Sequence, residues 1–346
     1  GSGLVGSEMC IRDRYYREEW GDFMSKFKNL TARLLTTFFI FSLTSINVQA
    51  TSTQSNKENI KNEKEVIDIT NDPNYVVSKG DVSLENIELS VNENELVINS
   101  KKRDAETIND LQKLKSLIEK HDGLEDDLIN NIKENHNIIS IGYSEALLKL
   151  NDKNEIVPVT KQELLSKSSL GEPQKYGKLT LYTFVDSAVS GNQRFTVGYS
   201  DAKWSGFDGF NVETAPYVGE DFISITIPSR YTILNNYFWG SYATSGIGNP
   251  TGRLTEVSQN SLIYAFDELT KLPGINATTY TNSIRIAARA STNNLTPTTE
   301  MYSSQYIHTY SKLNLSPSIS SGGSIDWGIG SSDEAWKLSS YCTTNF

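Results

Sequence analysis

SIRIAAR, residues 283–289, alternates apolar and polar side chains. Successive side chains of a β-strand point to opposite faces of the sheet, so Ile284 and Ile286 would share one face. Arg285 and Arg289 would share the opposite face. One apolar and one polar face is typical of an antiparallel sheet that covers a core on one side only. The stretch therefore predicts a half-buried strand of an antiparallel sheet.

Segments of the same kind recur throughout the C-terminal half. Residues 306–315 alternate in the same way, with Ile307 and Leu313 on the face opposite Tyr306 and His308. Clusters of Ser, Thr, Asn, Gly and Pro separate the segments at spacings typical of an antiparallel sandwich or barrel. The predicted strands are 178–186, 194–204, 221–227, 231–242, 261–266, 279–290, 302–315, 324–329 and 336–342. The pattern of residues 255–272 fits a short helix equally well.

Composition changes sharply near residue 170. Residues 51–170 contain no Trp and no Phe, whereas residues 171–346 contain four Trp, eight Phe and thirteen Tyr. The formal net charge is −8 in the first segment and −3 in the second. A polar Gly/Pro linker coincides with this change. The sequence therefore predicts a mainly β protein with a domain boundary near residue 170, after which residues 171–346 form an antiparallel β-sandwich.

The segment before this boundary has two parts. Residues 51–103 are rich in Asn, Lys, Glu and Ser with scattered apolar residues, so we expect them to be largely disordered. From Asp104, a suitable N-cap, apolar residues recur three or four apart and resume after a break at Gly123, which predicts a helical hairpin. Two strand-like runs around the turn signal NDKN then predict a β-hairpin. Residues 104–170 would form a spacer or a pro-segment.

A secretory signal peptide is predicted at residues 24–50. Met24 is followed by basic residues, an apolar run and a small-residue pattern that predicts cleavage after Ala50. Residues 1–23 precede this signal and are interpreted as a non-native leader. Without the leader, which contains Cys10, Cys342 is the single cysteine of the chain, so no intramolecular disulfide is expected. These features predict a secreted, extracellular protein.

Three stretches carry a resemblance to a known group of proteins. They are AKWSGFDGFNVETAPYVGEDFISI at residues 202–225, YIHTYSKLNLSPSIS at 306–320 and SIDWGI at 324–329. On these residues the chain resembles uncharacterised exported proteins of Gram-positive, clostridial-type bacteria. The resemblance implies export from the cell, and it implies no catalytic residue.

The stretch 200–225 combines acidic and aromatic residues. Asp208 and Glu213 are candidates for a carboxyl pair, which a glycoside hydrolase holds about 5–10 Å apart across a cleft. However, Asp208-Gly209 is a turn signal, and the stretch lacks the alternating oxygen ligands of a calcium loop. The spacing of the three His residues fits no zinc site. The sequence therefore favours a non-enzymatic protein, with no catalytic residue, metal or cofactor assigned.

Aromatic residues provide the candidate binding surface. Most aromatic side chains fill cores, but so many are present that some are expected to be exposed for recognition. The candidates for ligand binding are Trp204, Phe207, Phe210, Tyr217, Tyr237 and Trp239. The expected partner is an extracellular glycan or protein. Nucleic acid is disfavoured because the chain after Ala50 has a net charge of −11 and no basic stripe.

Two alternative functions remain open at this stage. Residues 279–315 could form an amphipathic hairpin of the kind from which membrane barrels assemble, which would make the protein pore-forming or membrane-active. A surface hairpin of a soluble sandwich has the same alternation and is favoured. The second alternative is a wall-glycan hydrolase that uses Asp208 and Glu213.

Overall fold

The computed structural model describes the chain from residue 66 to residue 346 with short gaps. The gaps are residues 122, 135, 153–154, 168–175, 207–219, 244–247, 268, 272–277, 310–315, 321–324 and 329–334. The described residues all belong to one compact unit, residues 61–346. The interpreted leader and the predicted signal peptide lie outside the described residues.

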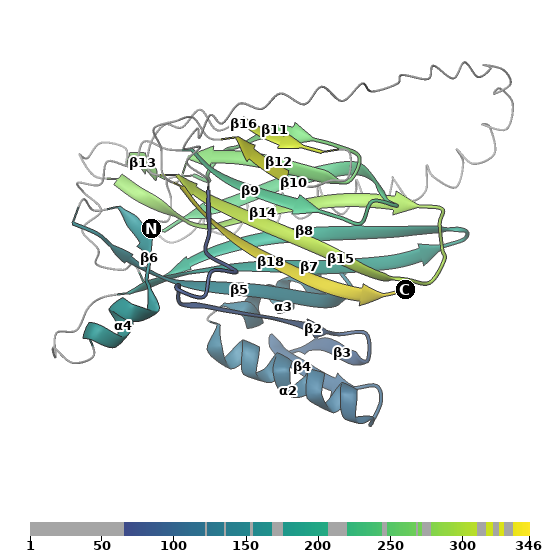
Figure 1. The fold of residues 1–346 in the computed structure, drawn as a ribbon. Coiled ribbons are helices and arrows are strands. Elements are labelled where there is room, and N and C mark those ends of the chain that lie inside the picture. The colour runs from purple at the N-terminus through teal and green to yellow at the C-terminus, as the bar shows by residue number, and fades with distance from the viewer. Residues whose placement is uncertain are drawn as a thin grey trace, which may run out of the picture. The chain divides into compact units, whose positions relative to one another are not determined.

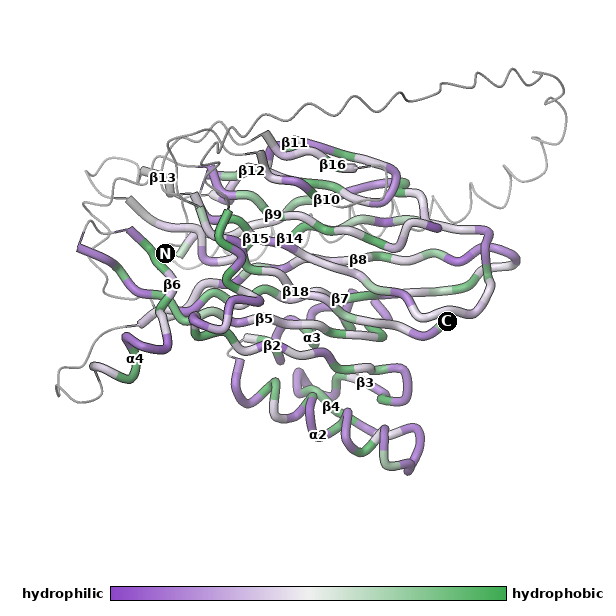
Figure 2. The backbone as a smooth tube through the Cα atoms, in the orientation of Figure 1, coloured by the Kyte–Doolittle hydropathy of each residue, from purple (hydrophilic) through white to green (hydrophobic). Residues whose placement is uncertain are grey.

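Strands make up most of this unit, and apolar and polar residues alternate along many of them (Figure 2). The helices are α2 (Ala105–Lys120), α3 (Leu124–Lys133) and α4 (Lys161–Lys167). The strands are β1 (Ile67–Asp68), β2 (Val77–Ser83), β3 (Ile87–Asn92), β4 (Glu95–Ser100), β5 (Ile138–Leu150), β6 (Ile156–Pro158), β7 (Gly177–Ser190), β8 (Gln193–Ser205), β9 (Glu220–Thr226), β10 (Thr232–Tyr242), β11 (Gly252–Val257), β12 (Ser261–Asp267), β13 (Leu269–Lys271), β14 (Thr278–Thr292), β15 (Thr299–Thr309), β16 (Ser316–Ile319), β17 (Ile325–Gly328) and β18 (Ala335–Asn345).

Two large sheets form a β-sandwich, as the sequence predicts (Figure 1). One sheet has six strands in the order β1-β18-β15-β9-β12-β11. The other has eight strands, with the order β10-β14-β8-β7-β5-β2 and with β13 and β6 paired to β14 and β5. The strand pairs are antiparallel except for β1 and β18, which run parallel.

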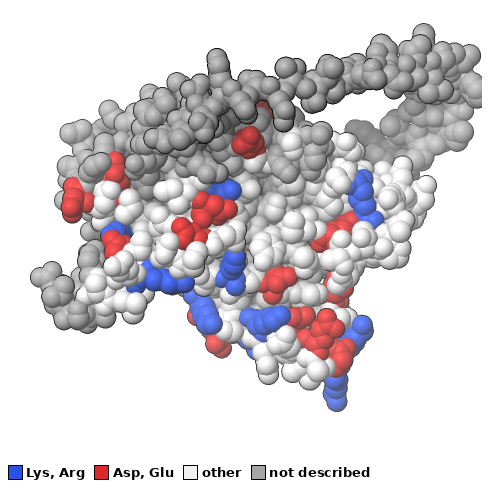
Figure 3. Space-filling model, in the orientation of Figure 1, with Lys and Arg blue, Asp and Glu red and all other residues white. Residues whose placement is uncertain are grey.

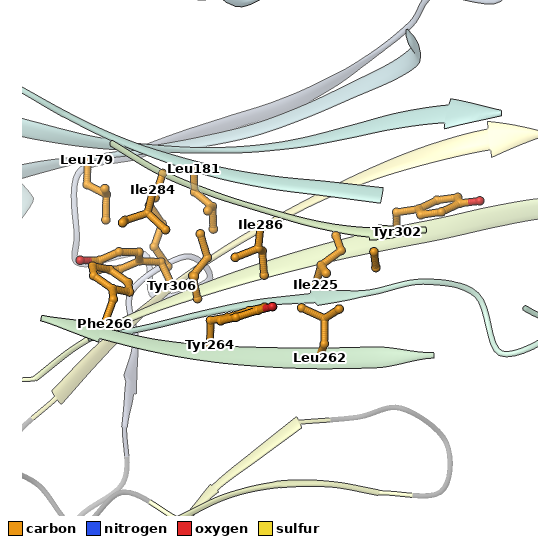
Figure 4. Packing of buried hydrophobic residues seen from close by; sticks show 14 of the residues in the cluster. Leu179, Leu181, Ile225, Leu262, Tyr264, Phe266, Ile284, Ile286, Tyr302 and Tyr306 are labelled. Atoms are coloured by element: carbon orange, nitrogen blue, oxygen red, sulfur yellow. The ribbon is translucent and has the colours of Figure 1, made fainter. Parts of the chain in front are cut away.

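The main core lies between the two sheets. Ile284 and Ile286 on β14 point toward Tyr264 and Phe266 on β12 (Figure 4), and all four side chains are buried. The strand predicted from SIRIAAR is confirmed, because its apolar face lies in this core. Burying each side chain of this size contributes about 1.5–3 kcal/mol. Trp336 adds a large buried ring from β18.

A second core lies on the outer face of the eight-stranded sheet. Helices α2 and α3 and the β3–β4 hairpin cover this face near β2, β5 and β7 (Figure 1). Leu114 and Leu128 from the helices pack in the same cluster as Tyr182, Phe184 and Tyr199 from the sheet. Both faces of β7 and β8 are therefore buried over much of their length.

A smaller cluster covers part of the outer face of the six-stranded sheet. Trp327 on the β16–β17 hairpin packs edge-to-face on Phe222 of β9, with ring centroids 5.7 Å apart. Its indole nitrogen donates a hydrogen bond to Gln305 of β15 at 2.8 Å. The short hairpin is thus held on the sheet by both apolar and polar contacts.

Strands from before residue 170 lie inside the same sheets as strands from after it, which corrects the predicted boundary. Strand β5 pairs with β7 along ten residue positions, and β1 pairs with β18. At Gly142 of β5, a Cβ atom would lie 2.0 Å from the carbonyl oxygen of Tyr341, so only glycine fits there. Residues 66–103, predicted to be largely disordered, form β1 to β4. Composition missed this because a polar strand needs only a neighbour to complete its backbone hydrogen bonds.

The local structures predicted before residue 170 are confirmed, although the domain boundary is not. Asp104 caps α2, since its carboxylate accepts a hydrogen bond from the Thr107 backbone nitrogen at 2.8 Å. Gly123, with φ 79°, separates α2 from α3. Strands β5 and β6 form the predicted β-hairpin. These features depend on contacts between residues that are close together in the chain, so sequence patterns predict them directly.

The predicted hairpin at residues 279–315 is wrong. Strand β14 belongs to the eight-stranded sheet and β15 to the six-stranded sheet, so the chain crosses between sheets at residues 293–298. Alternation cannot reveal this, because a half-buried strand looks the same whichever strand it pairs with. The alternative of a helix within 255–272 is also wrong, since residues 261–267 form β12.

Candidate ligand-binding surface

Tyr237 and Trp239 lie side by side on β10, the strand at one edge of the eight-stranded sheet. Their rings stack with centroids 5.6 Å apart and an interplanar angle of 20°. Residues two apart on a strand share a face, and Tyr237 packs against the second core, so both rings lie on the outer face. Trp239 is 43% exposed and Tyr237 is half-buried. The helices and the β3–β4 hairpin cover part of this outer face, and the aromatic pair lies at its edge on β10.

Arginine side chains flank the aromatic pair on β14. The register places Trp239 opposite Arg285, and Asn235 opposite Arg289. The Arg289 guanidinium lies 5.9 Å from the ring centroid of Phe195 on β8, within cation–π range. We call Tyr237, Trp239, Arg285 and Arg289 the aromatic–arginine strip.

One end of this strip is anchored by buried charges. Arg285 donates hydrogen bonds from Nε and Nη2 to one carboxylate oxygen of Asp201, at 3.0 and 2.6 Å. Its Nη2 also lies 3.7 Å from Asp127 of α3, and Lys203 donates to the other Asp127 oxygen. Burial and the neighbouring Asp201 charge raise the pKa of Asp127 to about 6, although Lys203 and Arg285 oppose this. The ion pairs tie α3 to the sheet next to the strip.

These ion pairs correct one expectation. The polar face of residues 283–289 was predicted to face solvent, but the Arg285 side chain is only 20% exposed. Burial lowers the pKa of Arg285, but the Asp201 and Asp127 carboxylates more than offset this and raise it. The sequence shows that Arg285 leaves the core face, yet it cannot show that a helix lies above it.

His136, just after α3, makes a second polar contact with the sheet. Its Nδ1 lies 3.0 Å from the Tyr199 hydroxyl and 3.5 Å from Asp186, and its Nε2 lies 3.3 Å from Glu134. Burial lowers the pKa of His136, but the hydrogen bonds and charges of Asp186 and Glu134 dominate and raise it to about 9. The imidazolium form therefore persists above neutral pH.

This shift predicts a pH-dependent stability. The folded pKa of His136 is about 9 and its ordinary value is 6.5, so its stabilising contribution is complete below pH 6.5. The contribution is lost as pH rises through 9, and it amounts to about 3 kcal/mol at most. Urea unfolding at several pH values should show His136→Gln destabilised most at pH 6 and least above pH 9. A gap between variant and parent that does not change with pH would contradict the assigned role.

Trp204, one of the predicted binding aromatics, lies in the main core instead. It is 5% exposed and packs edge-to-face on Tyr306 and Trp336, with centroid distances of 5.7 and 6.5 Å. Even-numbered residues of β8 face the core, whereas odd-numbered residues face outward. The remaining predicted residues, Phe207, Phe210, Tyr217, Asp208 and Glu213, lie outside the described residues.

The other chemically notable side chains are buried in structural contacts. His308 and Asp221 are fully buried, with the His308 Nδ1 3.1 Å from the carboxylate, which also accepts a hydrogen bond from the Tyr306 hydroxyl. Cys342 is buried too, and burial raises the pKa of its thiol to about 12. The sequence could not assign partners to Asp221, because Tyr306 and His308, which contact its carboxylate, lie on a different strand.

Three properties of the described residues bear on partners. Within the described ranges, no three His, Cys, Asp or Glu side chains gather closely enough to hold a metal ion. None of the helices in those ranges combines the length and apolar character needed to cross a membrane. On the face shown in Figure 3, acidic and basic side chains are interspersed.

The fold and the strip define a class: an antiparallel two-sheet β-sandwich with a helical cover and an aromatic edge. The sequence matches no family model and no curated protein. Among solved structures, the collagen-binding domain of a Staphylococcus aureus adhesin is 10% identical, with 45% of this chain and 95% of that domain covered and a TM-score of 0.22.

Two other solved structures are similar at a comparable or lower level. The Streptococcus parasanguinis Fap1 fimbrial structure, described for pH-induced modulation of adhesion, is 10% identical over 48% of this chain and 79% of that one, with a TM-score of 0.21. The N-terminal domain of the Streptococcus gordonii adhesin Sgo0707 is 7% identical over 82% and 86%, with a TM-score of 0.13. Similarities this weak establish neither a family nor a ligand for this chain.

Proposed function

We propose that the protein is an exported, non-enzymatic β-sandwich that binds an extracellular glycan or protein through the aromatic–arginine strip. The observation that carries this proposal is the stacked pair of Tyr237 and Trp239 at the open edge of the eight-stranded sheet. Export is proposed from the signal-peptide pattern at residues 24–50 and from the resemblance to exported proteins of Gram-positive bacteria.

The residue types of the strip support binding. Trp, Tyr and Arg are the side chains that most often dominate the binding energy of interfaces. Stacking on Tyr237 limits the rotation of Trp239, so little side-chain entropy remains to be lost when a partner binds. The ion pairs of Arg285 with Asp201 and Asp127 hold the neighbouring charge in place. The strip is therefore preorganised, because the aromatic rings and the Arg285 guanidinium are held in place before a partner binds.

Substitutions in the strip should weaken binding without unfolding the protein. A panel of soluble oligosaccharides and extracellular matrix proteins is first screened for binding to the full chain. Trp239→Ala is then expected to weaken binding of the selected partner at least tenfold, which corresponds to about 1.4 kcal/mol. Tyr237→Ala should have an effect of the same direction, because Trp239 loses its stacking partner. Calorimetry or surface plasmon resonance measures the dissociation constant.

Tyr341 offers a matched control on the other sheet. It is 45% exposed on β18, close to the exposure of Trp239. Tyr341→Ala removes an exposed aromatic ring of similar accessibility and should change the dissociation constant less than twofold. Equal effects of Trp239→Ala and Tyr341→Ala would contradict the assignment of the binding surface to β10.

A further inference from the structure

A cavity of about 290 Å³ lies where the β7–β8 hairpin meets the last residues of β18. Segments from distant parts of the sequence line it: the residues after β2, the start of β5, the end of β7 and residues 345–346 at the end of β18. Its volume is just below the range for small-molecule sites, which is roughly 300–1,000 Å³. It shares no residue with the aromatic–arginine strip.

Arg194 of β8 is one of the charged residues that line this cavity. The residue is only 9% exposed, and its guanidinium lies 4.1 Å from the ring centroid of Phe346, another lining residue. Within the described part of the chain, neither Nε nor Nη1 of Arg194 has a hydrogen-bond acceptor. A buried cation without an acceptor is costly, because it has lost water without gaining a partner. Among the described residues, these two nitrogens of a buried positive charge are thus left without a counterpart.

Two other charged residues, Lys101 and Glu85, line the cavity. Lys101 donates a hydrogen bond to the backbone oxygen of Glu85 at 3.3 Å. The Glu85 carboxylate accepts a hydrogen bond from the Asn345 backbone nitrogen at 3.1 Å. Glu85 is therefore committed to the chain end rather than to Arg194, and Lys101 adds a second positive charge to the wall.

The remaining wall is partly apolar and partly polar. Leu84, Ile139 and Val189 line it together with the ring of Phe346. Asn137 and Ser187 add polar groups that can donate or accept hydrogen bonds. A ligand that fits this lining has one negative, planar end and one apolar end.

We propose that this cavity binds a carboxylate carried on a small apolar group, with Arg194 as the residue that receives the carboxylate. A guanidinium is planar and donates several hydrogen bonds in fixed directions, which matches a carboxylate better than an amide or a hydroxyl. The Phe346 ring and the aliphatic wall hold the apolar part. A free organic acid and the carboxyl terminus of a peptide share this chemistry.

Calorimetry with the full chain tests the proposal. The probes are 3-phenylpropionate, its neutral analogue 3-phenylpropionamide, and a short peptide ending in a free phenylalanine carboxylate. The carboxylate is expected to bind at least tenfold more tightly than the amide. A preference for the peptide over 3-phenylpropionate identifies a chain terminus as the source, and the reverse identifies a free acid.

Two variants locate the site. Arg194→Gln should weaken carboxylate binding at least tenfold, whereas Arg253→Gln, which changes an exposed arginine paired with Glu220, should leave it within twofold. Ala188 is an exposed lining residue of β7, so Ala188→Phe fills the cavity while leaving the core intact. It should also abolish binding, and it serves as the test if Arg194→Gln does not fold. Equal binding of acid and amide, unchanged binding in Ala188→Phe, or no binding at about 10 mM probe would overturn the proposal.

Discussion

A chain that begins at residue 171 is expected to lose its cooperative fold, whereas a chain that begins at residue 61 should keep it. The truncation removes β5, which pairs with one side of β7, and β1, which pairs with β18. It also uncovers Tyr182 and Phe184, which pack beneath α2 and α3. The remaining strands would then expose both an unpaired edge and an apolar face.

The size of the effect follows from the buried side chains that are lost. The removed segment contributes many fully buried residues, among them Ile69, Leu114, Leu124, Leu128 and Leu148. At about 1.5–3 kcal/mol each, five such residues contribute roughly as much as the whole unfolding free energy of a typical domain, about 5–15 kcal/mol. The loss is therefore expected to be complete rather than partial.

Urea unfolding followed by circular dichroism and tryptophan fluorescence measures this. The 61–346 chain should show one transition in which both signals coincide, and the 171–346 chain should show none. A 171–346 chain with its own cooperative transition at the same midpoint would mean that the back half folds alone. The prediction also bears on export: residues 61–170 would be retained in the working protein, or would stay bound to it after cleavage.

Asp221→Ala is expected to destabilise the protein by about 3–5 kcal/mol. Asp221 is fully buried at the start of β9, and its carboxylate accepts hydrogen bonds from the Tyr306 hydroxyl and from the Thr309 backbone nitrogen, the latter at 3.0 Å. It also contacts His308 at 3.1 Å. Alanine removes the acceptor but leaves these polar groups buried, so each loses a partner that water cannot replace.

The neighbouring residue supplies the control for this prediction. Glu220 has a side chain that is 44% exposed and is paired with Arg253 on the surface. Surface ion pairs contribute about 0–1 kcal/mol, so Glu220→Ala should change the unfolding free energy little. Urea denaturation at pH 7 compares the two. Similar losses in both variants would show that the buried network is not a major source of stability.

Sequence patterns predicted strands and helices well because these depend on near neighbours along the chain. The alternation in 283–289 identified the core face of β14, and the N-cap at Asp104 identified the start of α2. The same reasoning failed for Trp204. Its polar and apolar neighbours do not alternate clearly, because both faces of β8 are buried.

The candidate binding surface could be predicted only in part. Tyr237 and Trp239 were candidates because they are aromatic, and the structure places them together at a sheet edge. Arg285 and Asp127 could not be added from the sequence, since one lies on β14 and the other on α3. Arg194 became notable only when its surroundings showed a buried guanidinium without an acceptor.

By itself the amino-acid sequence determined that this protein is mainly β, where most of its strands and its two long helices lie, and which side chains of SIRIAAR face inward. Only the tertiary structure decided which strand pairs with which, that the segment before residue 170 belongs to the same sheets, and that the apparent hairpin at 279–315 divides between two sheets. The physical reason is the distance along the chain over which each interaction acts. Side-chain alternation and helix capping act over a few residues, whereas strand pairing joins residues that can lie more than a hundred positions apart and leaves no periodic mark on either segment.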